Sequence, residues 1–205
     1  MVPPYRHSGA DIAFWALVGL LVLGEYAMQF RSFSDVIRRR SGRVVERGSL
    51  AVVFLTVAGG VVVGFKLAHG HTGEIGTGAW PLFGVGLLLM IAGIAIRWWA
   101  ILVLGRFFTP DVRVQPNQTV VDRGPYRWVR HPSYSGLIIC FVGVGLALGN
   151  WLSLAVLLVI PTAGLLVRIS AEERVLLEFL GEPYRQFCAS RPRLFPHPGR
   201  RAARR

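Results

Sequence analysis

The chain has 205 residues, of which 53% are hydrophobic and only 17% are charged, and its mean hydropathy is +0.48. Soluble domains are usually about a quarter charged, so this composition argues against an ordinary soluble domain. The formal net charge of +12 comes almost entirely from arginines that lie between long apolar runs. Membrane topology explains this pattern better than a nucleic-acid interface does. We therefore expect an integral membrane protein without a nucleic-acid partner.

Five apolar stretches are expected to form membrane-spanning helices. They lie at about 12–30, 50–68, 80–104, 134–148 and 152–169. The last two are short for a bilayer that needs about 20 residues per span, and only the turn-forming pair Gly149-Asn150 separates them. We expect a tight helical hairpin there, which crosses the bilayer only partly or where it is thinned. The N-terminal residues lack the order of a cleaved signal peptide, so the first stretch is expected to be retained.

The arginines predict how these spans are oriented. Two of the loops between spans are rich in them: Arg31, Arg38, Arg39, Arg40, Arg43 and Arg47 after the first span, and Arg106, Arg113, Arg123, Arg127 and Arg130 after the third. The loop at 70–79 and the turn at 149–150 contain neither arginine nor lysine. The positive-inside rule then predicts an N-terminus outside and a C-terminus in the cytoplasm. The expected location is the inner membrane of a prokaryote.

Several glycines within the spans are spaced for close helix packing. They occur as Gly60-xxx-Gly64, Gly84-x-Gly86 and Gly145-xxx-Gly149. The pair Gly143-x-Gly145 does not indicate a dinucleotide site, because no strand precedes it. Pro161 is expected to bend the fifth span, and Glu25 is expected to face the interior of the bundle.

Two polar stretches near the fourth span depart from what a plain membrane bundle needs. Residues 105–130 form a long segment that contains aromatic and apolar side chains, which indicates an ordered cap rather than a disordered loop. Residues 130–136 open the fourth span with Pro132 in the position that suits a first helical turn. This leaves two roles open for His131, which are helix cap and ligand contact.

A third polar stretch, residues 168–173, lies where the fifth span leaves the membrane. Arg168 and Glu172 are four residues apart and therefore neighbours on one helix face. An arginine still inside an apolar run is costly and marks a candidate functional site. An interfacial charge pair that ends the span is the alternative explanation. Residues 172–189 are expected to form an amphipathic helix, broken at Gly181-Glu182-Pro183, that packs back on the cap.

These stretches, in this order, resemble the isoprenylcysteine carboxyl methyltransferase family and the wider group of membrane methyltransferases, which includes phospholipid methyltransferases. The matching residues are Gly124-Pro125-Tyr126, Arg130-His131-Pro132-Ser133-Tyr134-x-Gly136, Arg168-xxx-Glu172-Glu173, Leu176, Phe179, Tyr184 and Arg193-Leu194-Phe195-Pro196. The resemblance covers roughly residues 100–196. It implies an all-α integral membrane fold of about five transmembrane helices, with a cytoplasmic cofactor-binding cap and a C-terminal helix.

The resemblance also implies a set of site residues around S-adenosylmethionine. The cofactor-binding residues would be Gln118, Thr119, Val120, Val121, Tyr126, His131, Pro132, Ser133, Tyr134 and Glu172. Arg168 would bind the methyl acceptor and, with Glu172, form the catalytic pair. A further polar cofactor contact falls on either Arg113 or Gln115, because a gap leaves its position ambiguous.

The implied function is an S-adenosylmethionine-dependent methyltransferase that releases S-adenosylhomocysteine. Its acceptor would be the carboxylate of an isoprenylcysteine-like molecule or another lipophilic acceptor. Two alternatives remain open, which are a phospholipid N-methyltransferase and a non-catalytic membrane protein.

Three regions are expected along the chain. Residues 1–105 would hold the first three spans, residues 106–196 the catalytic region, and residues 197–205 a basic tail on anionic membrane lipids. No metal is expected. His69, His71 and Glu74 are the candidate ligands, and in a glycine-rich loop they are a weak pattern.

Overall fold

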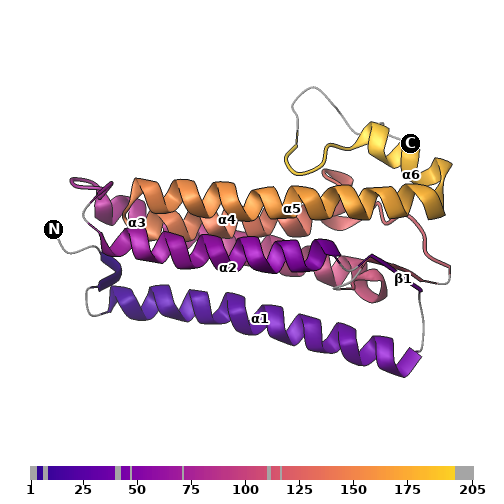
Figure 1. Ribbon diagram of the computed structural model, residues 1–205, viewed down its shortest axis with the longest axis horizontal. Coiled ribbons are helices and arrows are strands. Elements are labelled where there is room, and N and C mark those ends of the chain that lie inside the picture. The colour runs from indigo at the N-terminus through magenta and orange to yellow at the C-terminus, as the bar shows by residue number, and fades with distance from the viewer. Residues whose placement is uncertain are drawn as a thin grey trace.

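The computed structural model describes residues 4–6, 9–39, 43–46, 48–70, 72–109, 112–115 and 117–196. The side chains at position 6 and at positions 28–39, 43–46 and 113–114 are outside this description, as is the basic tail at 197–205. In the described part of the chain, five long helices run alternately up and down in one bundle (Figure 1). They are α1 (Ala10–Arg39), α2 (Gly48–His69), α3 (Ala79–Leu104), α4 (Pro132–Ala147) and α5 (Trp151–Leu180).

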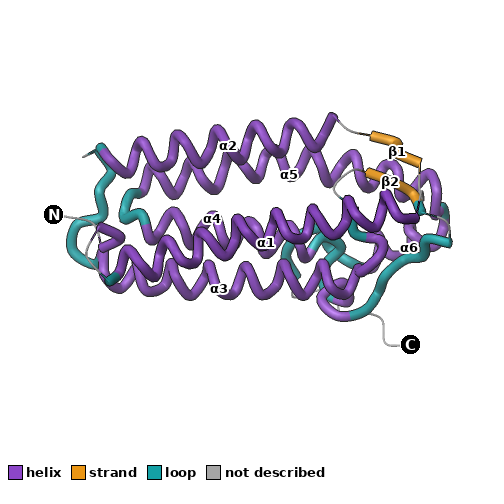
Figure 2. Tube along the Cα trace, turned by 90° about the horizontal axis from the view of Figure 1, so that it is seen from below, coloured by secondary structure: helices purple, strands orange, loops and turns teal. Residues whose placement is uncertain are grey.

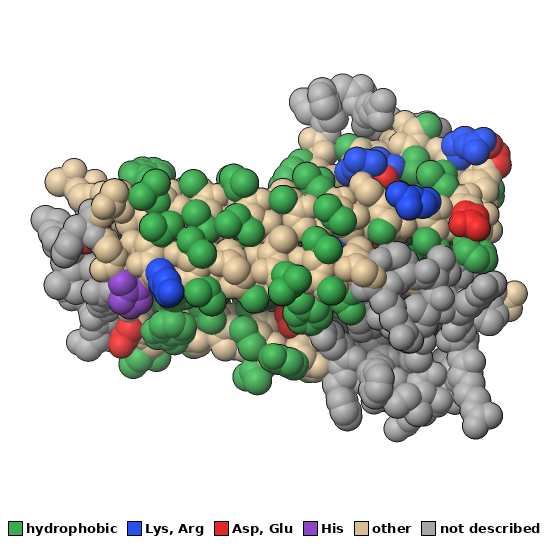
Figure 3. Space-filling model, in the orientation of Figure 1, with side chains coloured by type: hydrophobic (Ala, Val, Ile, Leu, Met, Phe, Trp, Pro, Cys, Tyr) green, Lys and Arg blue, Asp and Glu red, His purple; other side chains and the backbone are tan. Residues whose placement is uncertain are grey.

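Each helix overlaps one of the five apolar stretches of the sequence, although α1 and α5 continue well beyond theirs. Among the residues that the structure describes, α1, α2, α3 and α5 are long and apolar enough to cross a membrane, whereas α4 has only 16 residues. Many of their large apolar side chains point outward, as with Ile12, Leu55 and Leu88, which are 71%, 73% and 67% exposed. Apolar side chains cover the middle of the face seen in Figure 3, and charged ones gather towards its ends. The protein is therefore an integral membrane protein, as the composition predicted.

The expected hairpin joins α4 to α5. Gly149 takes a positive φ of 67° in the turn, and the Asn150 side chain caps α5 by accepting a hydrogen bond of 3.0 Å from the backbone N–H of Ser153. The Asn150 amide also donates to the Thr72 carbonyl at 2.9 Å. This side chain therefore ties the turn to the loop between α2 and α3.

Glycines allow α3 and α4 to approach closely. A Cβ built on Gly93 would lie 2.5 Å from the Gly136 carbonyl oxygen, and one built on Gly86 would lie 2.7 Å from the Gly143 carbonyl oxygen. On the other side of the bundle, the predicted pair in α2 also packs: Gly60 and Gly64 lie against Pro161 and Leu157 of α5. Gly84 differs, because nothing lies within 4 Å of its Cβ position.

Replacing Gly93 with valine is expected to lower the free energy of unfolding by about 1–3 kcal/mol, because the added carbons would force α3 and α4 apart. Thermal denaturation in detergent measures the effect. Gly84→Val on the same helix is the matched control, since its side chain would enter open space. Equal melting temperatures for the two variants would contradict the role of Gly93.

The cap and the C-terminal helix lie at one end of the bundle (Figure 2). There a short antiparallel sheet pairs β1 (Arg43–Glu46) with β2 (Val112–Val114), with Val44 opposite Arg113. The all-helical prediction did not include this sheet. Three 3₁₀ helices, η1 (Pro4–Arg6), η2 (Gly105–Phe107) and η3 (Gly124–Arg127), and the helix α6 (Glu182–Ser190) complete the described elements.

One expected helix boundary was wrong. The segment 172–180 is no separate helix, because α5 runs uninterrupted through Pro161 and beyond Ile169 to Leu180. The predicted break follows at Gly181, which has a positive φ of 60° and separates α5 from α6. Glu172 therefore lies on the same continuous helix as Arg168.

Candidate active site

The start of α4 is held in place by a late segment of the chain. The backbone N–H groups of Arg130 and His131 donate to the carbonyls of Pro192 and Arg193, both at 2.9 Å. The Ser135 hydroxyl donates to the Leu194 carbonyl at 2.5 Å. Backbone bonds of this kind fix the loop before α4, and so they fix the direction in which His131 points.

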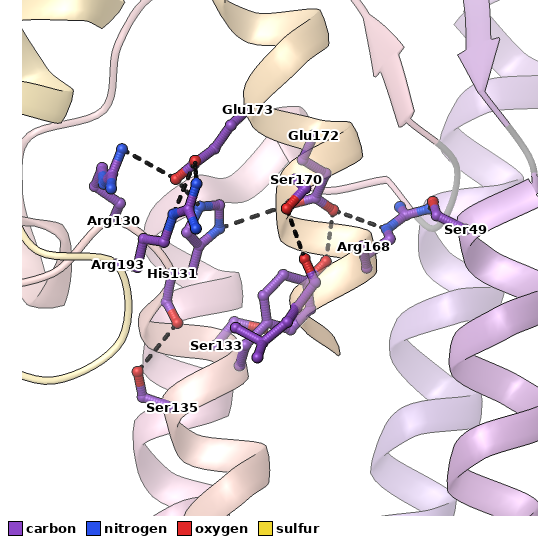
Figure 4. A network of polar contacts seen from close by, with 12 residues as sticks. Ser49, Arg130, His131, Ser133, Ser135, Arg168, Ser170, Glu172, Glu173 and Arg193 are labelled. Atoms are coloured by element: carbon purple, nitrogen blue, oxygen red, sulfur yellow. Dashed lines mark hydrogen bonds and ion pairs between the residues drawn. The ribbon is translucent and has the colours of Figure 1, made fainter. Parts of the chain in front are cut away.

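His131 occupies the N-cap position of α4, but its side chain makes no capping hydrogen bond. Its Nε2 atom lies 3.1 Å from Glu173 Oε1, and its Nδ1 atom lies 3.7 Å from Glu172 Oε2 (Figure 4). The ring also stacks on Tyr134, with 5.7 Å between centroids. The imidazole therefore lies between two carboxylates of α5, and the capping interpretation of its side chain is wrong.

Arg168 and Glu172 form the ion pair that their spacing predicted. Arg168 Nε donates to Glu172 Oε1 at 2.9 Å, and the Tyr134 hydroxyl donates to the same oxygen at 2.5 Å. Arg168 also donates from Nη1 to the Ser49 hydroxyl of α2 at 3.1 Å. No local pattern indicated a role for Ser49, because this contact joins residues 119 positions apart.

Glu173 is a second carboxylate to which the sequence interpretation gave no role. It is 6% exposed and accepts hydrogen bonds from Arg193 Nε and Nη2 at 3.1 and 2.8 Å. Arg130 Nη1 lies 3.0 Å from it. Glu173 thus joins the loop before α4, the end of α5 and the segment after α6. The position of Glu173 beside Glu172 could have suggested a role in the site, but its partners come from distant parts of the sequence.

A cavity opens between the cap, α4, α5 and α6, and it is named the polar cavity after Arg130, His131 and Glu172 in its otherwise largely apolar wall. It is lined by Leu104, Phe107, Phe108, Thr109, Val112, Gln118, Thr119, Val120, Val121, Tyr126, Arg130, His131, Ser133, Tyr134, Glu172, Leu176, Leu180, Tyr184 and Phe187. Nine of the ten residues expected to bind the cofactor are among them. The exception is Pro132, which is fully buried in the first turn of α4 and is not part of this wall.

Of the two candidates for the further polar cofactor contact, the structure describes the side chain of Gln115 only. Gln115 does not line the polar cavity, and its amide donates to the Arg106 carbonyl at 2.5 Å. The side chain of Arg113 lies outside the described residues. Gln118 lines the cavity, although its Oε1 atom accepts from the backbone N–H of Gln115 at 3.0 Å.

Two tyrosines give the polar cavity neutral aromatic walls. Burial raises the pKa of Tyr126, and the charge of Glu172 raises it further. Burial likewise raises the pKa of Tyr184 in α6. Both phenols therefore stay protonated at neutral pH.

A second, apolar cavity lies between α1, α2, α4 and α5. Its lining is Val18, Leu21, Val22, Glu25, Tyr26, Leu50, Val53, Phe54, Val57, Val61, Phe65, Arg97, Phe108, Thr109, Tyr134, Leu137, Phe141, Val144, Leu157, Leu165 and Arg168. It shares Phe108, Thr109 and Tyr134 with the polar cavity. The Arg168–Glu172 ion pair joins the two, because Arg168 lines the apolar cavity and Glu172 the polar one.

Arg97 is a buried cation that the sequence interpretation missed within its third span. Its guanidinium pairs with Glu25 of α1, which was correctly expected to face the bundle interior. In the described part of the chain, no group of three or more metal-ligating side chains could hold a metal ion, and His71 lies outside that part.

Comparisons with known proteins support the resemblance found in the sequence. The model of the "Isoprenylcysteine carboxyl methyltransferase (ICMT) family" matches residues 85–178. A "Probable protein-S-isoprenylcysteine O-methyltransferase" of Oryza sativa subsp. indica is 34% identical over 111 residues, which are 53% of this chain and 58% of that protein. The "Protein-S-isoprenylcysteine O-methyltransferase" of Saccharomyces cerevisiae is 33% identical over 105 residues, which are 50% of this chain and 44% of that protein. The chain thus spans about half the length of these curated relatives.

A solved structure confirms the fold. It is the "eukaryotic intramembrane Ras methyltransferase ICMT (isoprenylcysteine carboxyl methyltransferase)", with a TM-score of 0.66 and 22% sequence identity. The match covers 93% of this chain and 69% of that chain, so it includes the N-terminal helices that the family match does not reach.

Proposed function

Because residues 85–178 match the isoprenylcysteine carboxyl methyltransferase family, we propose that this chain is a membrane methyltransferase. It transfers the methyl group of S-adenosylmethionine to a lipophilic acceptor. The observation that carries the proposal is the junction of two unlike cavities at Tyr134 and the Arg168–Glu172 pair. A polar donor on one side and an apolar acceptor on the other would meet there.

The polar cavity suits S-adenosylmethionine in its chemistry. The Glu172 carboxylate can accept hydrogen bonds from an ammonium or from ribose hydroxyls. The rings of Tyr126, Tyr134 and Tyr184 offer faces to an adenine ring or to a sulfonium cation. Residues 118–121 of the cap line the cavity, where their backbone groups could bind the cofactor.

The protein contributes orientation and the exclusion of water. When bound, S-adenosylmethionine supplies an activated methyl group for in-line displacement by the acceptor. Arg168 would bind an acceptor carboxylate and hold it towards the junction through a charge-assisted hydrogen bond. Orientation of two reactants can account for about 7–11 kcal/mol of a reaction barrier in favourable cases. An ionised carboxylate needs no general base, so His131 is assigned to binding rather than to proton transfer.

The acceptor is proposed to carry an anionic group on an apolar chain, like the isoprenylcysteine carboxyl group in the description of the matching family. Arg168 in the wall of the apolar cavity supports this choice. An amine acceptor, such as a phospholipid head group, would first have to lose a proton. His131 and Glu172 are the groups at the junction that could take it.

The proposed setting is the inner membrane of a prokaryote, with the polar cavity and the C-terminus on the cytoplasmic side. The cap, α6 and the end of α1 lie together at one end of the bundle (Figure 2). The arginine-rich loops of the sequence therefore fall at that end. The proposed division remains a transmembrane region at 1–105, a catalytic region at 106–196 and a basic tail at 197–205.

Isothermal titration calorimetry with S-adenosylhomocysteine tests the donor site. We expect one binding site per chain in the protein purified in detergent. Absence of heat from a folded sample, with folding checked by circular dichroism, would overturn the methyltransferase proposal.

Methyl transfer from labelled S-adenosylmethionine then separates the acceptors. The arms are a prenylated cysteine with a free carboxylate, phosphatidylethanolamine, and a lipid extract. Label in the first arm, as a base-labile ester, is the expected result. Base-stable label in phosphatidylethanolamine alone would replace the carboxylate proposal with N-methylation.

A further inference from the structure

Arg97 is a charged side chain about two turns before the end of an otherwise apolar helix. It lies in α3 and is 6% exposed, and seven residues of helix separate it from the end of α3 at Leu104. An ionised group at this depth in a membrane protein costs free energy and points to a function in which its partners take part. The hydrogen-bond partners of Arg97 therefore indicate its role.

The guanidinium of Arg97 has two kinds of partner. Its Nε and Nη2 atoms donate to the two carboxylate oxygens of Glu25 on α1, with 2.5 Å between Nη2 and Oε2. Its Nη1 atom donates to the Ser133 hydroxyl at 2.8 Å and to the Ser133 carbonyl at 3.2 Å. Arg97 thus connects α1 to the first turn of α4, and each of its three guanidinium nitrogens donates to Glu25 or to Ser133.

The backbone is shaped to bring Arg97 to this position. A Cβ built on Gly136 would lie 2.8 Å from the Arg97 backbone nitrogen and 3.1 Å from the Arg97 Cβ. The glycine, one turn along α4 from Ser133, therefore leaves the space that the arginine needs. This close approach explains why the sequence has glycine there.

Helix stability alone is a weak reason for the Arg97–Glu25 pair. The cost of removing two charges from water commonly cancels their attraction, and apolar side chains of similar volume often stabilise a protein as well or better. The contact with Ser133 is different, because Ser133 lines the polar cavity.

The Ser133 hydroxyl has one proton to donate and accepts the Nη1–H of Arg97. Within the described residues, no acceptor is found for that proton. Because the hydroxyl oxygen already accepts a hydrogen bond from Arg97, its O–H can turn towards the polar cavity, which Ser133 lines.

We propose that Arg97, held by Glu25, is a positioning residue for the donor site: it fixes the Ser133 side chain so that its hydroxyl donates a hydrogen bond to the ligand in the polar cavity. This inference rests on the proposed function, because it takes that ligand to be S-adenosylmethionine or S-adenosylhomocysteine. It gives Glu25, which lies outside the family match, a part in cofactor binding.

A double-mutant cycle on S-adenosylhomocysteine affinity tests the proposal. The variants are Ser133→Ala, the paired replacement Arg97→Met with Glu25→Leu, and all three together; the paired replacement avoids an unpaired charge. We expect the first two variants each to raise Kd about five- to tenfold, which is the size of one hydrogen bond. We expect the Kd of the triple variant to lie within about twofold of the Kd of Ser133→Ala or of the paired replacement, because all three variants lose the same hydrogen bond.

Two further variants keep the result interpretable. Arg97→Lys keeps a charge opposite Glu25 but cannot reach both Glu25 and Ser133, so it is expected to raise Kd by the same factor, even if the paired replacement does not fold. Met90→Ala opens a cavity in the same α3–α4 contact and is expected to lower the melting temperature without changing Kd.

Several outcomes would overturn the inference. One is an unchanged Kd in a folded Arg97 variant. Another is a Kd of the triple variant that equals the product of the separate effects. The third is a Met90→Ala variant in which Kd rises as the melting temperature falls. Wild-type protein that binds no S-adenosylhomocysteine would instead overturn the proposed function itself.

Discussion

Replacing Arg168 with alanine is expected to lower the rate of methyl transfer by about 10²- to 10³-fold, the usual cost of losing a preorganised donor at a reacting group. The affinity for S-adenosylhomocysteine is expected to change by less than about threefold. Arg168 lines the apolar cavity and not the polar one, and Glu172 keeps its 2.5 Å bond from Tyr134 without it. The loss would therefore fall on the acceptor.

Turnover with a prenylcysteine acceptor and calorimetry with S-adenosylhomocysteine measure the two halves of this prediction. Arg185→Ala is the matched control, because Arg185 pairs with Glu182 on the exposed surface of α6. It should leave both quantities unchanged. If Arg168→Ala turned over at the wild-type rate, the ion pair would be only the interfacial end of a span.

Replacing Glu172 with glutamine is expected to weaken S-adenosylhomocysteine binding by about 10- to 100-fold. Hydrogen bonds to a charged group contribute about 1.5–3 kcal/mol, and the substitution keeps the shape of the side chain while removing its charge. Turnover should also fall, because Arg168 loses the carboxylate that orients it. Calorimetry with S-adenosylhomocysteine measures the effect on donor binding, and turnover with saturating donor measures the effect on the acceptor.

Glu178→Gln provides the control for Glu172, since Glu178 lies exposed on the same helix less than two turns further on. Its variant should bind as the wild type does. A Glu172→Gln protein with affinity within about twofold of the wild type would remove Glu172 from the donor site, whatever its turnover.

The sequence predicted the helices well because lipid imposes a simple rule on composition. Apolar runs marked α1 to α5, and the turn pair Gly149-Asn150 separated the last two. Hydropathy marks where a helix leaves the apolar layer, however, and not where the helix ends. Residues 170–180 contain no helix-breaking residue, so α5 continues to Gly181.

The candidate site was predictable where its contacts are local. The Arg168–Glu172 pair follows from a spacing of four residues on one helix. The contacts of Arg97 with Glu25, of Glu173 with Arg193, and of β1 with β2 join distant parts of the chain. No periodicity in the sequence predicts such pairs, because they depend on how the helices pack against one another.

The bonds from Pro192 and Arg193 to the loop before α4 have a consequence for how the protein is made. The helices α1 to α5 precede these residues in the chain, so the bundle can insert into the membrane before the loop is anchored. Donor binding would then arise last in biosynthesis, after residues 191–194 have been translated. A nascent chain that stalls before them would hold a complete set of spans but an unfinished catalytic end.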